Sequence, residues 1–102
     1  MINEYEKVIS LIFKAINDIN QQLLPEQRVD PSPETVLIGE QSNLDSMALV
    51  SLLVVIEGEV GQDFGIDFTL VDENRPLDEN ILKNVSTLAE YITDIINKQK
   101  VL

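Results

Sequence analysis

Apolar residues recur at three- and four-residue intervals in three separate stretches of the chain, the pattern of amphipathic helices. The first predicted helix covers residues 3–23, with Asn3 as its N-cap and Pro25 as its stop. The last covers about residues 85–96, with Asn84 or Ser86 as its cap. The apolar face of the first helix contains Tyr5, Val8, Ile9, Ile12, Ile16, Ile19 and Leu23, and that of the last contains Val85, Leu88, Ala89, Ile92, Ile95 and Ile96.

The middle helix is predicted to begin at Asp45 or Ser46 and to end between Val60 and Phe64. It has two apolar stripes, roughly 140° apart at 100° per residue. The core stripe contains Leu49, Leu52, Leu53, Ile56 and Val60, and the second stripe contains Met47, Val50 and Val54. An exposed apolar stripe usually marks a partner site. The alternative is that the preceding loop covers it.

Two connections complete the chain. Residues 25–44 form a long loop that holds three prolines and Gly39, and four apolar residues are available to attach it to the core: Val29, Val36, Leu37 and Ile38. Residues 66–84 are ambiguous, with a helical turn expected at 77–82 and a strand at 66–71 discounted because it would have no partner. The prediction is one all-α domain over residues 1–102, a bundle of three main helices plus one short helix, with the first and last packed against the second.

Composition removes several kinds of chemistry. The chain has no Cys and no His, so it offers no thiolate, imidazole metal ligand or Ser-His-Asp arrangement. We therefore expect no enzyme and no metal site, and a calcium-binding helical protein is disfavoured because no Asp-x-Asn-x-Asp-Gly loop occurs. The acidic N-terminus does not resemble a secretory signal. The longest apolar run, "MALVSLLVVI", is about half of the ~20 residues that a membrane span needs, which favours a soluble cytoplasmic protein.

Charge narrows the partners. The net charge is −11, and no Lys or Arg occurs between Arg28 and Arg75. The negative electrostatic potential of such a chain repels nucleic acid and anionic membrane, whereas it attracts basic protein surfaces. The alternative interpretation is that the negative charge only keeps the protein soluble.

Ser46 stands at the mouth of the middle helix, directly after Asp45. Serine at this place is most often an N-cap. It has no neighbouring base in sequence to activate it as a nucleophile. A helix N-terminus nevertheless stabilises a phosphate ester. Ser46 is therefore better suited to being modified than to acting as a nucleophile.

The stretch "LDSMALVSLLVVIE" resembles the Asp-Ser-Leu signature of acyl carrier proteins and related peptidyl carriers. The order of elements and the closing "VSTLAEYI", with Tyr91 and Ile92, extend the resemblance over most of the chain. It implies a 4'-phosphopantetheine arm on Ser46, attached by a phosphopantetheinyl transferase, whose thiol holds acyl groups as thioesters. Asp45 would help to orient the transferase and its metal-bound coenzyme A.

The resemblance also implies a docking surface for the transferase and for acyl-loading and acyl-processing enzymes with basic surfaces. Met47, Val50 and Val54, with Glu57 and Glu59, would form it, and the protein would be a monomer. The chain departs from the fatty-acid-synthesis type in several places. Met47 replaces the usual Leu, Ala48 and Ser51 stand where acids are common, "DFTLVDENRPLD" is extra sequence, and the loop before Ser46 reads "IGEQSNLDS" instead of the shorter Asp-Leu-Gly type. They favour a stand-alone carrier in a specialised lipid or secondary-metabolite pathway. An aminoacyl or peptidyl carrier, or a small helical adaptor without a prosthetic group, remains an alternative.

Overall fold

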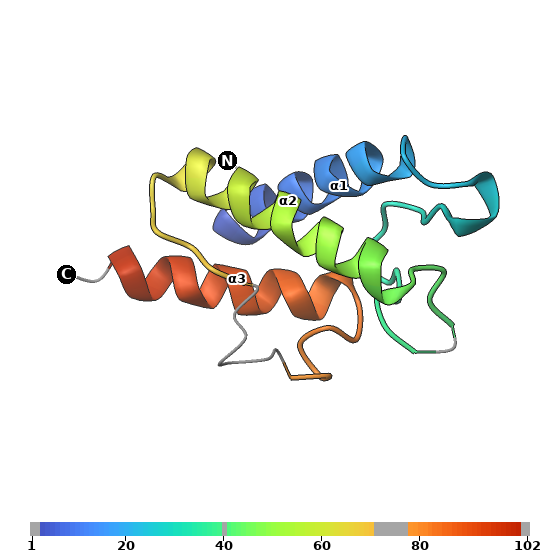
Figure 1. The fold of residues 1–102 in the computed structure, drawn as a ribbon. Helices are drawn as coiled ribbons and strands as arrows, with labels where there is room; N and C mark the ends of the chain where they lie inside the picture. The colour runs from blue at the N-terminus through green and yellow to red at the C-terminus, as the bar shows by residue number, and fades with distance from the viewer. Residues whose placement is uncertain (1–2, 40, 71–77, 101–102) are drawn as a thin grey trace.

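Three α-helices form the protein in the computed structural model, which describes residues 3–39, 41–70 and 78–100 (Figure 1). They are α1 (Glu4–Asn20), α2 (Ser46–Phe64) and α3 (Val85–Lys100), with a short 3-10 helix, η1, at Pro25–Gln27. The described residues contain no strand, only an isolated bridge between Val36 and Asn84. The predicted all-helical class is confirmed. In Figure 1, α1 runs opposite to α2 and α3.

The first helix starts where the sequence predicts and ends early. The Asn3 side chain accepts the backbone N–H of Glu6 at 2.8 Å and caps the helix. At the other end, the Asn20 side chain holds the backbone of Val29, accepting its N–H at 3.0 Å and donating to its carbonyl at 2.8 Å. The Arg28 Nε also donates to the Asn20 carbonyl at 3.0 Å. These bonds turn the chain back on itself, so α1 ends before the predicted residue 23.

Buried side chains from all three helices and both connections form the core. The connections contribute Val29, Leu37, Phe68 and Leu70, and the helices contribute Val8, Ile12, Ala15, Ile16, Ile19, Leu52, Leu53, Ile56, Val60, Val85, Leu88, Ala89, Ile92 and Ile96. Of the predicted core stripe of α2, only Leu49 is half-buried instead of buried. Gly65, at φ 63°, adopts the left-handed conformation that ends α2.

The helix that packs closely on both others is α1, which corrects the expectation that α2 would do so. A hydrogen bond joins the first turn of α1 to the first turn of α3: the hydroxyls of Tyr5 and Ser86 lie 2.9 Å apart. Segment 66–70 bridges α2 and α3, because Glu57 accepts the Leu70 N–H at 2.7 Å and Gln99 donates to the Asp67 carbonyl at 3.1 Å. With Phe68 and Leu70 buried, this segment supplies packing that a direct contact between α2 and α3 would otherwise provide.

The long connection is fastened to the beginning of α3. Leu37 N–H donates to the Lys83 carbonyl at 3.3 Å, and Val85 N–H donates to the Thr35 carbonyl at 3.0 Å. Asn84 caps α3 by accepting the Thr87 N–H at 2.9 Å. Before it, residues 79–82 form turns, while residue 77 of the expected short helix lies outside the described residues. No helix in the described ranges is long and apolar enough to cross a membrane.

Candidate functional site at the start of α2

The N-terminus of α2 lies at the end of the bundle where α1 ends and α3 begins (Figure 1). Asp45 is its N-cap, because the carboxylate Oδ1 accepts the Ala48 N–H at 2.8 Å. Ser46 is the first helical residue and is exposed. In the part of the chain that the structure describes, its hydroxyl makes no hydrogen bond. The hypothesis that Ser46 is the cap is therefore wrong, and its hydroxyl is free to meet a reagent from outside.

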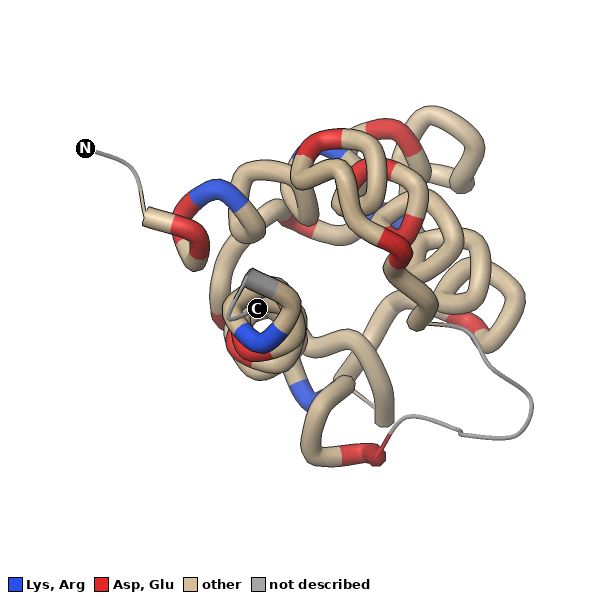
Figure 2. The backbone as a smooth tube through the Cα atoms, turned by 90° about the vertical axis from the view of Figure 1, so that its left-hand side faces the viewer, with Lys and Arg blue, Asp and Glu red and all other residues tan. Residues whose placement is uncertain are grey.

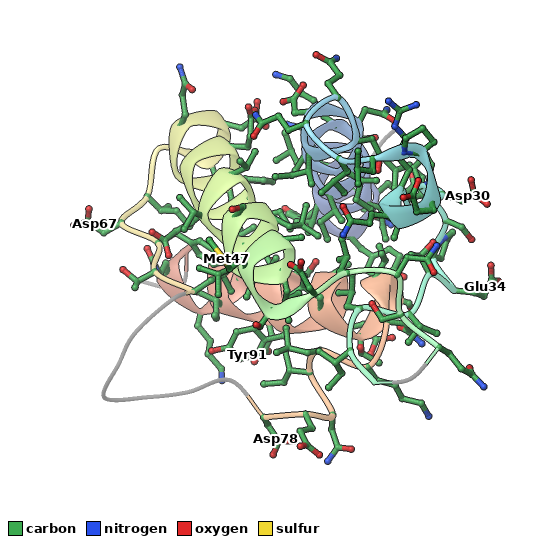
Figure 3. All side chains as sticks on the ribbon, turned by 45° about the vertical axis from the view of Figure 1, so that its right-hand side comes forward. Asp30, Glu34, Met47, Asp67, Asp78 and Tyr91 are labelled. Carbon is green, nitrogen blue, oxygen red and sulfur yellow. The ribbon has the colours of Figure 1, made fainter. Side chains whose placement is uncertain are left out.

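Beside Ser46 the second apolar stripe of α2 is open to solvent. Met47, Val50 and Val54 are 80%, 48% and 51% exposed. The alternative that the long connection covers this stripe is therefore wrong. Figure 3 shows Met47 on the first turn of α2, whereas the labelled acids Asp30, Glu34, Asp67 and Asp78 point outward elsewhere on the molecule. A shallow hollow of about 300 Å³, lined by Ser46, Met47, Val50 and Ser51, joins the serine to the stripe.

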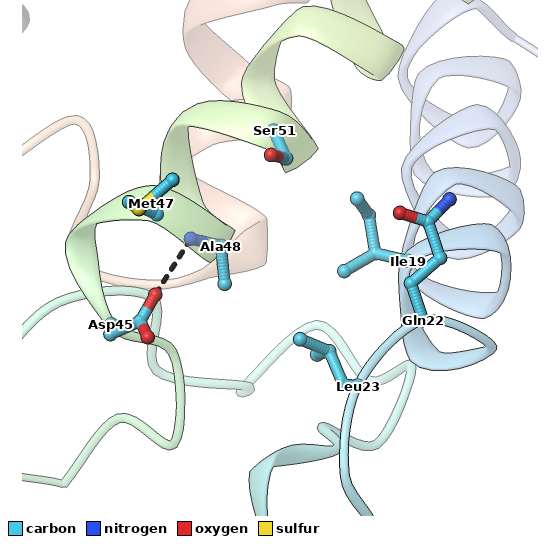
Figure 4. Close-up of a pocket in the computed structure, with 7 residues that line it drawn as sticks. All are labelled: Ile19, Gln22, Leu23, Asp45, Met47, Ala48 and Ser51. Atoms are coloured by element: carbon cyan, nitrogen blue, oxygen red, sulfur yellow. Dashed lines mark hydrogen bonds between the residues drawn. The ribbon is translucent and has the colours of Figure 1, made fainter.

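A second hollow, of about 210 Å³, separates the first turn of α2 from the end of α1 (Figure 4). Its lining residues are Ile19, Gln22 and Leu23 from the α1 side, with Asp45, Met47, Ala48 and Ser51 from the α2 side. The Ala48 methyl group points toward the α1 side, and Ala48 is only 9% exposed. An acid at this position would extend into the hollow that Ile19 and Leu23 also line.

The two acids expected on the docking surface have partners within the chain. The Glu57 carboxylate bonds to the backbone of segment 66–70, as described above. The Glu59 Oε2 lies 3.2 Å from the Lys14 Nζ of α1. Asp and Glu positions occur along all three helices (Figure 2), yet residues 46–56 of α2 carry no charged side chain. On the helix side of Ser46 the surface is therefore apolar and hydroxyl-bearing, with Asp45 as the one adjacent carboxylate in sequence, and the acids of α2 lie toward its C-terminal half.

The site contains a hydroxyl, a capping carboxylate and apolar side chains. Within residues 3–39, 41–70 and 78–100, no group of three or more His, Cys, Asp or Glu could hold a metal ion. Sequence reasoning had not settled that Asp45, and not Ser46, is the cap, because both residue types cap helices well. It had also missed the burial of Ala48. Alanine is too small to stand out in the apolar periodicity of the helix, so the pattern gave no signal for this residue. Comparisons with protein-family models, with curated proteins and with solved structures found no match.

Proposed function

We propose that the protein is a carrier that holds acyl intermediates as thioesters on a 4'-phosphopantetheine arm attached to Ser46. The observation that supports this most is the division of roles at the start of α2. Asp45 caps the helix, so the Ser46 hydroxyl stays exposed and without a hydrogen bond among the described residues. A serine held in this way can be modified without disturbing the helix that presents it.

The surroundings of Ser46 fit a phosphodiester. The free N–H groups and positive dipole end of α2 favour an anion at its first turn. Among the described residues, no basic side chain lines either neighbouring hollow, so we assign the favourable potential to the helix itself. The arm, when bound, supplies the thiol that this cysteine-free chain lacks. Asp45 Oδ2 has no hydrogen bond among the described residues, and we assign it the role of orienting the transferase and its metal-bound coenzyme A.

Partners would dock on the stripe formed by Met47, Val50 and Val54. Those partners are the transferase and the enzymes that load and process the acyl group. Because Glu57 and Glu59 have partners within the chain, we assign them to the long-range field that attracts basic surfaces, and not to direct contact. The carrier fold is further supported by the order of its elements: α1, a long connection, α2 opening on Asp45 and Ser46, and α3. A cytoplasmic monomer in a specialised lipid or secondary-metabolite pathway agrees with this role.

The exposed stripe would equally serve a helical adaptor without a prosthetic group, and the two functions differ in one observable. A carrier gains the mass of the arm when it is incubated with coenzyme A, Mg²⁺ and a broad-range phosphopantetheinyl transferase. Intact-mass spectrometry of the wild-type chain and of Ser46→Ala, Ser42→Ala and Ser51→Ala variants tests this. We expect only Ser46→Ala to stay unmodified. An unmodified wild-type chain, or an arm found on Ser42 or Ser51, would contradict the proposal. Subsequent loading with acyl or aminoacyl groups separates an acyl carrier from a peptidyl carrier.

A further inference from the structure

Met47 presents a thioether to solvent directly beside Ser46. It is 80% exposed, more than Val50 or Val54 of the same stripe. The chain has two methionines and no cysteine, and the other methionine is Met1 at the chain start. The hollow of about 300 Å³ that Met47 lines also contains Ser46, Val50 and Ser51, so a small polar oxidant can reach the sulfur from the side on which the serine lies.

We propose that Met47 is a regulatory oxidation site whose oxidant is a hydroperoxide, and that its oxidation slows attachment of the arm to Ser46. In the chemical step, the Sδ lone pair attacks one oxygen of hydrogen peroxide and the O–O bond breaks. The Sδ–O bond forms, the other oxygen leaves as water after proton transfer, the sulfur loses two electrons and the peroxide gains them. Methionine sulfoxide is reversible through sulfoxide reductases, as a regulatory modification requires.

The effect on partners follows from the position of Met47 in the stripe. Oxidation converts a flexible apolar side chain into a polar, chiral one. No charged side chain lies within residues 46–56 to take over recognition, so the partner would lose one of three apolar anchors. This second half of the inference rests on the proposed carrier function, because it requires an enzyme that docks beside Ser46.

The fold does not depend on the Met47 side chain. Met47 is absent from the buried core, and the bond that caps α2 joins Asp45 to the Ala48 backbone. Oxidation of Met47 should therefore change the surface without unfolding the bundle. A buried methionine would behave in the opposite way, because its oxidation would have to follow unfolding.

The test treats the full chain with hydrogen peroxide and locates the added oxygen by peptide mass spectrometry. The rate of arm attachment is then measured with coenzyme A and a broad-range phosphopantetheinyl transferase. We expect Met47 to oxidise at a rate near that of free methionine, with an unchanged melting temperature by circular dichroism. Arm attachment should slow by about fivefold, as when an interface anchor is lost. Methionine sulfoxide reductases should restore the rate. The matched control is Met47→Leu, whose attachment rate should be unaffected by peroxide.

Three results would overturn the inference. The first is protection of Met47 from peroxide in the folded chain. The second is an equal attachment rate before and after oxidation, and the third is an equal loss of rate in Met47→Leu. Absence of arm attachment in the untreated wild-type chain would instead overturn the proposed carrier function, and with it the effect on partners. The two failures are thus distinguishable.

Discussion

The Asp45 carboxylate and the Ala48 backbone N–H are joined by a hydrogen bond of 2.8 Å, and this bond closes the first turn of α2. Ser46 lies inside that turn and contributes nothing to the cap. Replacing Asp45 by alanine should therefore lower the free energy of unfolding by about 1 kcal/mol. Replacing Ser46 by alanine should change it by less than ~0.5 kcal/mol, as for an ordinary surface position. Urea denaturation of both variants measures the difference, with Asp45→Asn as a control that retains a cap. Equal losses for Asp45→Ala and Ser46→Ala would contradict this assignment.

The burial of Ala48 predicts that an acid is harmful there. Ala48→Asp would place a carboxylate against Ile19 and Leu23, in the hollow at the end of α1. Met47→Asp is the matched control, because it places the same charge in the same helical turn on an exposed side chain. Thermal and urea denaturation should find Ala48→Asp less stable than Met47→Asp by about 1–3 kcal/mol, the cost of burying a poorly paired polar group. Similar stabilities would mean that the α1 end moves aside easily.

Core truncation on α2 and α3 gives a third prediction. Leu53 is 6% exposed and Ile92 is fully buried. Leu53→Ala and Ile92→Ala should each lower the free energy of unfolding by roughly 2–5 kcal/mol, through lost burial and a residual cavity. Val54→Ala, one residue from Leu53 but 51% exposed, is the control and should cost far less. A large loss for Val54→Ala would show that the second stripe is covered in solution.

Glu57 should act on the local order of segment 66–70. Its carboxylate accepts the Leu70 N–H at 2.7 Å, so Glu57→Ala should speed hydrogen exchange of the Leu70 amide by up to roughly tenfold. Glu57→Gln retains an acceptor oxygen and should have a smaller effect. Amide exchange followed by NMR distinguishes the two variants. An unchanged exchange rate of the Leu70 amide in Glu57→Ala would contradict the proposed role of Glu57 in ordering this segment.

The apolar character of the site predicts how the binding of a partner to the stripe of Met47, Val50 and Val54 depends on salt concentration. Under the proposed carrier function, Val50→Ser should speed dissociation of the transferase with little change in the salt dependence of binding, because buried anchors act mainly on dissociation. Asp63→Asn should instead slow association, and mostly at low ionic strength, because exposed charges are screened beyond ~8 Å at physiological salt. Surface-plasmon kinetics across a salt series measures both. The prediction fails if Val50→Ser leaves dissociation unchanged. Asp72 and Glu73, two further acids of the chain, lie outside the described residues.

The apolar periodicity of the sequence was sufficient to predict the three helices and their buried faces. The spacing of Val8, Ile12 and Ile16, and of Leu88, Ile92 and Ile96, predicts faces that are buried in the structure. It also separated Leu52 and Ile56 from the exposed Met47 and Val54. The end of α1 was not predictable in this way, because it is set by bonds from Asn20 to Val29, nine residues away.

The packing of segment 66–70 and the bonding partners of Glu57 and Glu59 could not be predicted from the sequence either. Each depends on a contact between residues distant in the chain, namely Glu57 with Leu70 and Glu59 with Lys14. A carboxylate on a helix surface is equally compatible with solvent, with a lysine or with a backbone amide. The helix pattern therefore cannot assign its partner, and the expectation that Glu57 and Glu59 lie on the docking surface came from the resemblance alone.

The close packing of α1 on α3 has a consequence for how the chain reaches its fold. The hydroxyls of Tyr5 and Ser86 meet across a separation of 81 residues, so these contacts close a very long loop. Such non-local contacts slow the folding of a helical protein relative to a bundle whose neighbours follow one another in sequence. During synthesis, the part of the α1 face that packs on α3 has no partner until α3 has been made. In that interval the face is open to chaperones and to other nascent chains.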